Sequence, residues 1–263
     1  MQVSEPHQGK QAEPADAANR QGSRVDFDSL ELAFLGSLLP GIVHNLATPL
    51  SGVIGATQLL EMRTTEQERL LAELERGASQ SAEALKVQHQ KSCSNLDIMS
   101  RNARHLTELL QVIIRRFHRC SQDTVGPLSM FDMVSNELQF LDANLTYKHK
   151  VRKKFDLASD AYTVWAIYKH VAAVIDEFVL RALAVHDFSR GLVELNVTTN
   201  YANSQGTIVL EAKFFETEEE PLELDSLNLY LARIAENGAI YSVEKEAGRL
   251  VTKITLPRSA PKT

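Results

Sequence analysis

Two long apolar runs, with spacings that alternate between four and three residues, constrain this chain more than any other feature. Such spacing is a heptad seam, which places one apolar stripe along a helix. The residues between the runs favour helix, and RGASQS with Gly77 is the best turn. The pattern predicts two antiparallel helices that begin at a capping box, Asp28 to Glu31. The first run contains Leu35, Leu39, Ile42, Leu46, Pro49, Val53, Ala56 and Leu60, and the second contains Leu96, Met99, Ala103, Leu106, Leu110, Ile113 and Phe117.

A lone helical hairpin leaves half of its seam exposed to water. The usual remedy is a four-helix bundle, which two copies of the hairpin form when they pair. The first half of the chain therefore predicts a homodimer.

After Pro127 the pattern changes to mixed helix and strand. We expect helices at 130–145, 162–187 and 224–238, and strands at 149–157, 191–200, 206–215 and, with a turn at Gly248, 240–257. Several strands and three helices make a two-layer α/β sandwich. The predicted fold class is therefore α+β, with a long antiparallel hairpin followed by this sandwich.

The domain organisation follows from these patterns and from composition. Residues 1–25 are polar and aperiodic and predict a disordered leader, followed by the hairpin at 26–121. The sandwich spans 127–257, and 258–263 form a disordered tail.

Composition limits the kinds of partner that the chain can bind and the cellular compartment in which it is expected. A net charge of -6 argues against nucleic-acid binding, which needs a basic face. Cys93 and Cys120 provide neither a disulfide framework nor a metal cluster, which fits a reducing cytoplasm. We find no signal peptide and no apolar run of the ~18 residues that a membrane span needs, so we expect no membrane contact.

One histidine of the first helix, His44, lies away from the apolar seam. At about 100° per residue, the positions within about 60° of it carry small or hydroxyl side chains. A histidine of the core belongs on the apolar face instead, although a structural role is the alternative. Small neighbours let a partner surface approach the imidazole. These positions are Ser37, Gly41, Thr48, Ser51 and Gly55.

The stretch HNLATPLSGVIGATQLLE, residues 44–61, resembles the H-box of bacterial two-component sensor histidine kinases. Their dimerisation and phosphotransfer domain is the same kind of hairpin, so the resemblance implies that His44 is a phosphoacceptor. Thr48 stands where members with phosphatase activity orient a water. Asn45 stands where the family usually has the carboxylate that prepares the imidazole to attack ATP. An amide cannot remove a proton at neutral pH.

The second half is similar to the ATP-binding domain of the same kinases, but its nucleotide motifs are missing. The resemblance places Glu177 and Arg181 where the family has phosphate- and magnesium-binding asparagines. Phosphates also need backbone N–H groups of glycine-rich turns, yet no glycine lies between Gly206 and Gly238. The segment 214–228 is short and acidic where the family has an ATP lid. We therefore expect a degenerate ATPase-like domain without stably bound nucleotide, cofactor or metal.

Three functions follow from these observations. The favoured one is a histidine phosphotransfer protein, in which His44 accepts phosphate from a response-regulator aspartate and passes it to another receiver domain. Magnesium comes with the regulator. The second is a pseudokinase that binds or dephosphorylates a regulator. The third, an ATP-dependent kinase, is disfavoured by the missing glycines.

Two basic runs have simpler explanations. KHKVRKK, residues 148–154, predicts a solvated strand edge, with a patch for an acidic partner as the alternative. RRFHR, residues 115–119, ends a helix, where positive charge suits the helix dipole, with contact to an acidic regulator as the alternative.

Overall fold

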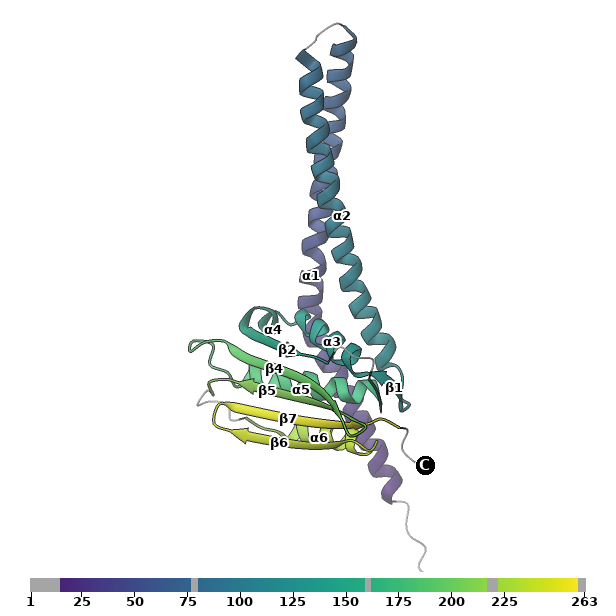
Figure 1. Cartoon of the computed structure of the whole chain (residues 1–263), viewed down its shortest axis with the longest axis vertical. Coiled ribbons are helices and arrows are strands. Elements are labelled where there is room, and N and C mark those ends of the chain that lie inside the picture. Colours follow the sequence, from purple (N-terminus) through teal and green to yellow (C-terminus); the bar gives the residue numbers. More distant parts are fainter. Residues whose placement is uncertain (1–14, 77–79, 159–161, 217–221, 260–263) are drawn as a thin grey trace, which may run out of the picture. The chain divides into compact units, whose positions relative to one another are not determined.

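The structure is a computed structural model that describes residues 15–76, 80–158, 162–216 and 222–259. The chain divides into two compact units, Met1–Leu39 and Pro40–Thr263, and most of the fold belongs to the second. Helix α1, Ala15–Glu75, continues through Pro40 and Pro49, and helix α2, Gln80–Cys120, returns antiparallel to it (Figure 1). The predicted hairpin is therefore confirmed. Of its predicted turn, residues 77–79 lie outside the described residues.

The predicted start of the first helix is wrong. Helix α1 begins at Ala15, so the proposed capping box at Asp28 lies inside the helix. No proline interrupts the sequence between these residues, and Gly22 alone does not stop a helix. Of the two segments predicted to be disordered, residues 1–14 and 260–263 lie outside the described residues.

The seam of α1 from Ile42 onward faces inward as predicted, with Pro49 and Ala56 buried. The seam of α2 divides into two sets. Met99, Leu106 and Ile113 are half-buried, whereas the residues at the alternate seam positions are exposed. These are Leu96 at 54%, Leu110 at 45% and Phe117 at 49%, together with Ala103. Because the two sets are offset by half a heptad, one hairpin covers only one of them.

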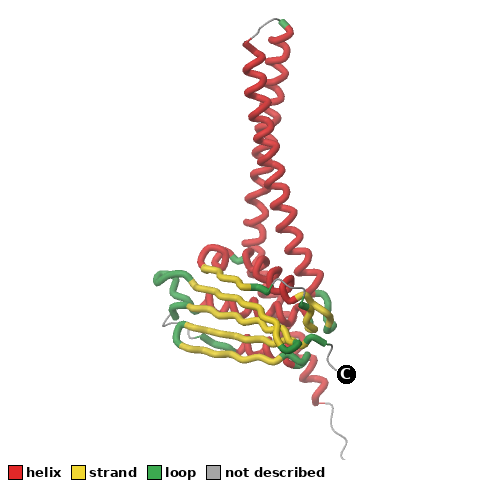
Figure 2. Tube along the Cα trace, in the orientation of Figure 1, coloured by secondary structure: helices red, strands yellow, loops and turns green. Residues whose placement is uncertain are grey.

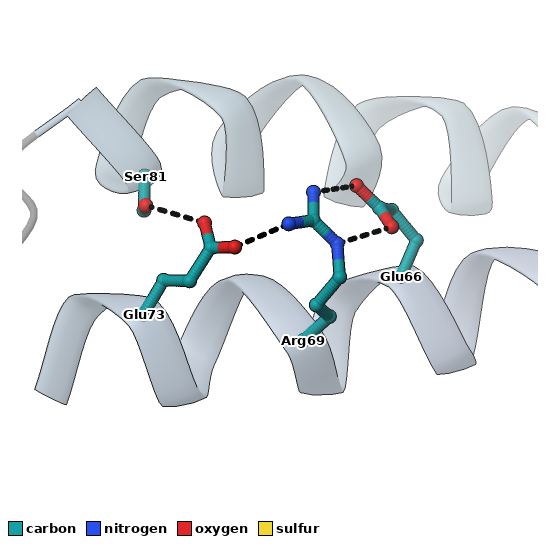
Figure 3. A network of polar contacts seen from close by, with 4 residues as sticks. All are labelled: Glu66, Arg69, Glu73 and Ser81. Carbon is teal, nitrogen blue, oxygen red and sulfur yellow. Dashed lines mark hydrogen bonds and ion pairs between the residues drawn. The ribbon is translucent and has the colours of Figure 1, made fainter. Parts of the chain in front are cut away.

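Near the turn, a polar network joins the two helices (Figure 3). Arg69 donates to both carboxylate oxygens of Glu66, at 2.9 and 2.6 Å, and also pairs with Glu73. Ser81 of α2 donates to Glu73 at 3.3 Å. The hydrogen bond from Arg69 lowers the pKa of Glu66 below its usual value. These exposed contacts fix the local register of the hairpin more than they stabilise it.

The second half is a five-stranded sheet with helices on one face (Figures 1 and 2). The strand order is β2-β4-β5-β7-β6, with β2 parallel to β4 and the other pairs antiparallel. Helices α3, α5 and α6 cover the face on which Val197, Leu210 and Ile254 are fully buried. The strands are β2 Val151–Asp156, β4 Val193–Ala202, β5 Gln205–Lys213, β6 Ile240–Glu246 and β7 Arg249–Pro257, and the helices are α3 Met130–Phe140, η1 Leu141–Ala143, α4 Leu145–Lys150, α5 Tyr168–Ala184 and α6 Asp225–Ala235.

The α+β fold class is thus confirmed, with two corrections. Residues 149 and 150 were expected to begin a strand, but they end helix α4, and β2 begins at Val151. Residues 163–166 were expected at the start of a long helix, but they form strand β3, Thr163–Ala166, which pairs with β1, Gly126–Ser129. Helix α5 begins only at Tyr168. An apolar run of this length is compatible with either structure, and β1 supplies the pairing partner that decides it.

Candidate functional site

His44 lies on α1, and its side chain is exposed. Thr48 and Ser51, one and two turns further on, are exposed as well. The Thr48 hydroxyl donates to the His44 carbonyl oxygen at 3.2 Å, a bond within the helix that leaves the imidazole unconstrained. A Cβ at Gly55 would meet nothing within 4 Å. The predicted strip from His44 to Gly55 therefore faces open space.

The two remaining residues of the predicted strip have other surroundings. Gly41 is buried, and a Cβ there would lie 1.6 Å from the carbonyl oxygen of Ala143. Packing within the chain thus explains this glycine. Ser37 belongs to the first compact unit, where its hydroxyl donates to the Phe34 carbonyl oxygen at 2.6 Å.

The two glycines give opposite expectations for stability. Gly41→Ala should lower the free energy of unfolding by about 1–3 kcal/mol, because the added methyl group collides with the backbone of η1. Gly55→Ala, its matched control on the same helix, should raise it by about 0.5–1 kcal/mol, because alanine favours helix and the site is open. Urea unfolding measures both. Equal effects of the two substitutions would contradict the packing of Gly41 against Ala143.

Asn45 joins the histidine-bearing helix to the second half of the chain. Its Nδ2 donates to the carbonyl oxygen of Asp142 at 2.9 Å, and its Oδ1 accepts from Lys148 Nζ at 2.8 Å. A carboxylate could accept from the lysine but could not donate to the carbonyl. The amide at this position therefore has a structural reason: it bonds η1 and α4 to α1 beside His44.

Short-range hydrogen bonds place Lys148. Asn144 caps α4, since its side chain accepts from the Tyr147 backbone N–H at 2.9 Å. Tyr147 is buried and anchors this short helix; its burial, with Asp142 nearby, raises the pKa of its hydroxyl. Lys148 follows directly, on the exposed side of α4.

A second junction joins α2 to the sandwich through buried charges. Arg116 is only 2% exposed and pairs with Glu137 of α3 and, at 2.7 Å, with Asp176 of α5. Its guanidinium carbon lies 4.9 Å from the centre of the Phe140 ring. Tyr168 donates its hydroxyl proton to Glu137. Burial raises the pKa of Tyr168 to about 12, so the hydroxyl keeps its proton at neutral pH.

A cleft of about 390 Å³ lies between these two junctions. Asn45 and His105 are among the polar residues that line it. The Nδ1 of His105 lies 3.9 Å from the Oε2 of Glu108. The cleft thus opens beside the helix that carries His44. Its apolar walls come from α1, α2, α3 and η1, and include Ile42, Leu46, Leu109, Val112, Phe140 and Ala143.

Glu177 and Arg181, which the resemblance assigns to a nucleotide site, bond to each other. Arg181 Nε donates to Glu177 Oε1 at 2.6 Å, and the Ser226 hydroxyl of α6 donates to the same oxygen. Glu177 therefore links α5 to α6, and Arg181 pairs with it within α5. Of the predicted acidic segment 214–228, residues 217–221 lie outside the described residues.

Neither the buried network around Arg116 nor the contact of Lys148 with Asn45 was predicted from the sequence. Asp176 carried a signal, because it is a carboxylate that directly follows the apolar run Val171–Ile175, whereas Glu137 has the polar neighbours Asn136 and Gln139 and carried little. Buried carboxylates need a partner. Arg116 carried none, since a basic residue near the carboxyl end of a helix is ordinary.

Two further observations concern metals and membranes. Among the residues that the structure describes, no three His, Cys, Asp or Glu side chains are grouped so as to hold a metal ion. Contrary to expectation, one stretch, Leu32–Glu75 of α1, is long and apolar enough to cross a membrane by length and composition, with a mean hydropathy of 1.2 in its best window.

The fold and the site define a helical hairpin with an exposed histidine, joined by polar contacts to an α/β sandwich. No protein-family model and no curated protein matches this chain.

Solved structures of similar arrangement include histidine kinases. The catalytic domain of histidine kinase ThkA has 13% identity and a TM-score of 0.42, covering 51% of this chain and 96% of that chain. Acinetobacter baumannii histidine kinase AdeS has 12% identity and a TM-score of 0.42, and the match covers 76% of this chain and 96% of the AdeS chain. A structure titled as a bacterial phosphotransferase has 16% identity and a TM-score of 0.36, covering 85% and 96%. At these values the likeness carries no argument about function.

Proposed function

We propose that this chain is a histidine phosphotransfer protein of a two-component phosphorelay. His44 accepts a phosphoryl group from the aspartyl phosphate of one response regulator and passes it to another receiver domain. The observation that carries the proposal is the pairing of an exposed His44 with an Asn45 whose amide is engaged by Asp142 and Lys148. A histidine beside an amide has no adjacent base, so it suits a phosphoryl donor that is already activated.

The chemistry needs no base. The ring nitrogen of His44 that carries no proton attacks phosphorus in line, and the N–P bond forms as the bond from phosphorus to the aspartyl oxygen breaks. The regulator's carboxylate leaves with the bonding electron pair. The second ring nitrogen keeps its proton, so phosphohistidine forms without prior deprotonation. The receiver domain supplies the magnesium ion, and the reverse steps phosphorylate the next regulator.

The proposal assigns no nucleotide to the sandwich. Glu177 bonds to both Arg181 and Ser226, and an arginine cannot replace the amide oxygen that would ligate magnesium. Because receiver domains are cytoplasmic partners, the relay works in the cytoplasm.

A transfer assay tests the proposal. Purified protein should take radiolabelled phosphate from phosphorylated receiver domains of the host and should take none from ATP. The label should be acid-labile and alkali-stable, as expected for phosphohistidine. Labelling by ATP would establish a kinase instead. If every receiver domain fails to phosphorylate the protein but loses its own phosphate in its presence, the pseudokinase alternative with phosphatase activity replaces the proposal.

The relay would work as a homodimer through the hairpin. Leu96, Leu110 and Phe117 are exposed at heptad spacing along α2, and a second hairpin that covers them completes a four-helix bundle. Because each of these side chains is already about half covered, burying the rest contributes roughly 1 kcal/mol each, about half of the value for full burial. Light scattering should therefore give twice the mass of the 29.3 kDa chain, and Leu110→Glu should shift it toward the monomer. A monomeric wild type would contradict this part of the proposal.

A further inference from the structure

The basic segment 148–154 begins at a contact with the residue that follows His44 and continues into a strand at the edge of the sheet. Sequence analysis favoured a solvated edge, and β2 is indeed an edge strand. However, residues 148–150 belong to α4, and Lys148 bonds to Asn45, the residue that follows His44 on α1. A lysine 103 positions away in the sequence is thereby placed next to the phosphoacceptor helix.

Lys148 differs from Arg152 and Lys153 of the same segment in what it pairs with. Lys153 forms an ion pair with Asp142 and lies 3.9 Å from the centre of the Tyr147 ring. Arg152 pairs with Glu194 at 2.6 Å. Lys148, by contrast, bonds a neutral amide oxygen, and within the described part of the chain no carboxylate lies within ion-pair distance of it. Its positive charge is therefore not neutralised within this part of the chain.

We infer that Lys148 contacts the phosphoryl group on His44 and stabilises it during transfer. This rests on the proposed function of His44. An ammonium group has three donors, and Asn45 uses one of them. The side chain is exposed, so the other two are available to phosphoryl oxygens. Lysine binds phosphate as a point charge on a flexible stem, which suits a group that is present only during the relay.

The contact matters most while phosphorus moves between nitrogen and oxygen. In a loose transition state the negative charge is spread over the three equatorial oxygens of the phosphoryl group. A cation held nearby by Asn45 stabilises that charge in both directions of transfer. Lys148 takes no part in bond making: it gives up no proton, and the aspartyl carboxylate remains the leaving group.

The test uses the full-length protein and two donors, a phosphorylated receiver domain and phosphoramidate, which needs no protein partner. Lys148→Met should slow phosphorylation of His44 by about tenfold or more with both donors, as expected for loss of one charge-assisted contact. Lys148→Arg should restore the rate to within about threefold of the wild type. Lys154→Met is the matched control: this exposed lysine of the same segment hydrogen-bonds to no described residue of α1, and its rate should stay unchanged.

A second comparison separates contact with phosphate from support of Asn45. If Lys148 only held Asn45, then Asn45→Ala alone would slow the reaction equally, and adding Lys148→Met would change nothing further. We expect the added substitution to slow the reaction again.

The outcomes distinguish a failure of the proposed phosphotransfer function from a failure of the proposed role of Lys148. A wild type that neither donor labels on His44 overturns the proposed function and this inference with it. A labelled wild type with an equally fast Lys148→Met variant overturns the role of Lys148 alone. If Lys148→Met is phosphorylated slowly by the receiver domain but at the normal rate by phosphoramidate, contact between Lys148 and the phosphoryl group is also overturned. Lys148 would then be a residue that binds the protein partner.

Discussion

His44→Ala should abolish phosphoryl uptake from a phosphorylated receiver domain and leave the fold intact. The imidazole is the proposed nucleophile, and no neighbouring side chain of the exposed strip can replace it, since Thr48 and Ser51 are unactivated hydroxyls. We therefore expect uptake to fall by at least about 1,000-fold, as it does when a nucleophile is removed. Because His44 is exposed, the free energy of unfolding should change by less than about 0.5 kcal/mol.

The control for this variant is a histidine of the same hairpin. His89 is exposed on α2, so His89→Ala removes an accessible imidazole without touching the α1 strip. This variant should take up phosphate at the wild-type rate. Light scattering on both variants checks that neither changes the oligomeric state. Acid-labile phosphate on His44→Ala would show that another residue accepts the phosphoryl group.

Local sequence patterns predicted most of the helices and strands, because these elements depend on periodicity and turn residues. The hairpin of β4 and β5 turns at Asn203 and Ser204, both with positive φ, and the strands β6 and β7 turn at Gly248, with φ of 69°. Glycine adopts a positive φ without strain, and asparagine is among the residues that tolerate it, so both turns carried a recognisable signal. In contrast, β3 was missed because only its pairing with β1 distinguishes it from helix.

In the candidate site, too, local geometry could be predicted and long-range contacts could not. The position of His44 on the outward side of α1 follows from helical geometry alone, and the structure places its side chain in the open. The role of Asn45 could not be predicted completely. The sequence shows that the residue is no base, but its bonds to Asp142 and Lys148 span 97 and 103 positions. Contacts of that separation depend on how the sandwich packs, which no local pattern records.

Arg116→Met should be the most destabilising single substitution discussed for this protein. The side chain is buried with Glu137 and Asp176, and methionine keeps much of its volume while removing the charge. Two carboxylates then remain buried without their shared cation. Removing one partner of such a buried group costs about 3–5 kcal/mol, a large fraction of the stability of a typical domain. The midpoint of urea unfolding, compared at constant slope, measures the loss.

The neighbouring Arg115 provides the control. Neutral substitutions of the two carboxylates test the cause of the lost stability. Arg115 is exposed and its Nε donates to the Gln111 carbonyl oxygen at 3.1 Å, so Arg115→Met should cost less than about 0.5 kcal/mol. Adding Glu137→Gln and Asp176→Asn to Arg116→Met should restore part of the lost stability, because the penalty arises from unpaired buried charge rather than from lost attraction. If the triple variant is less stable than Arg116→Met alone, this explanation fails, and the lost hydrogen bond from Tyr168 of α5 to the carboxylate of Glu137 of α3 becomes the stronger candidate for what stabilises this part of the sandwich.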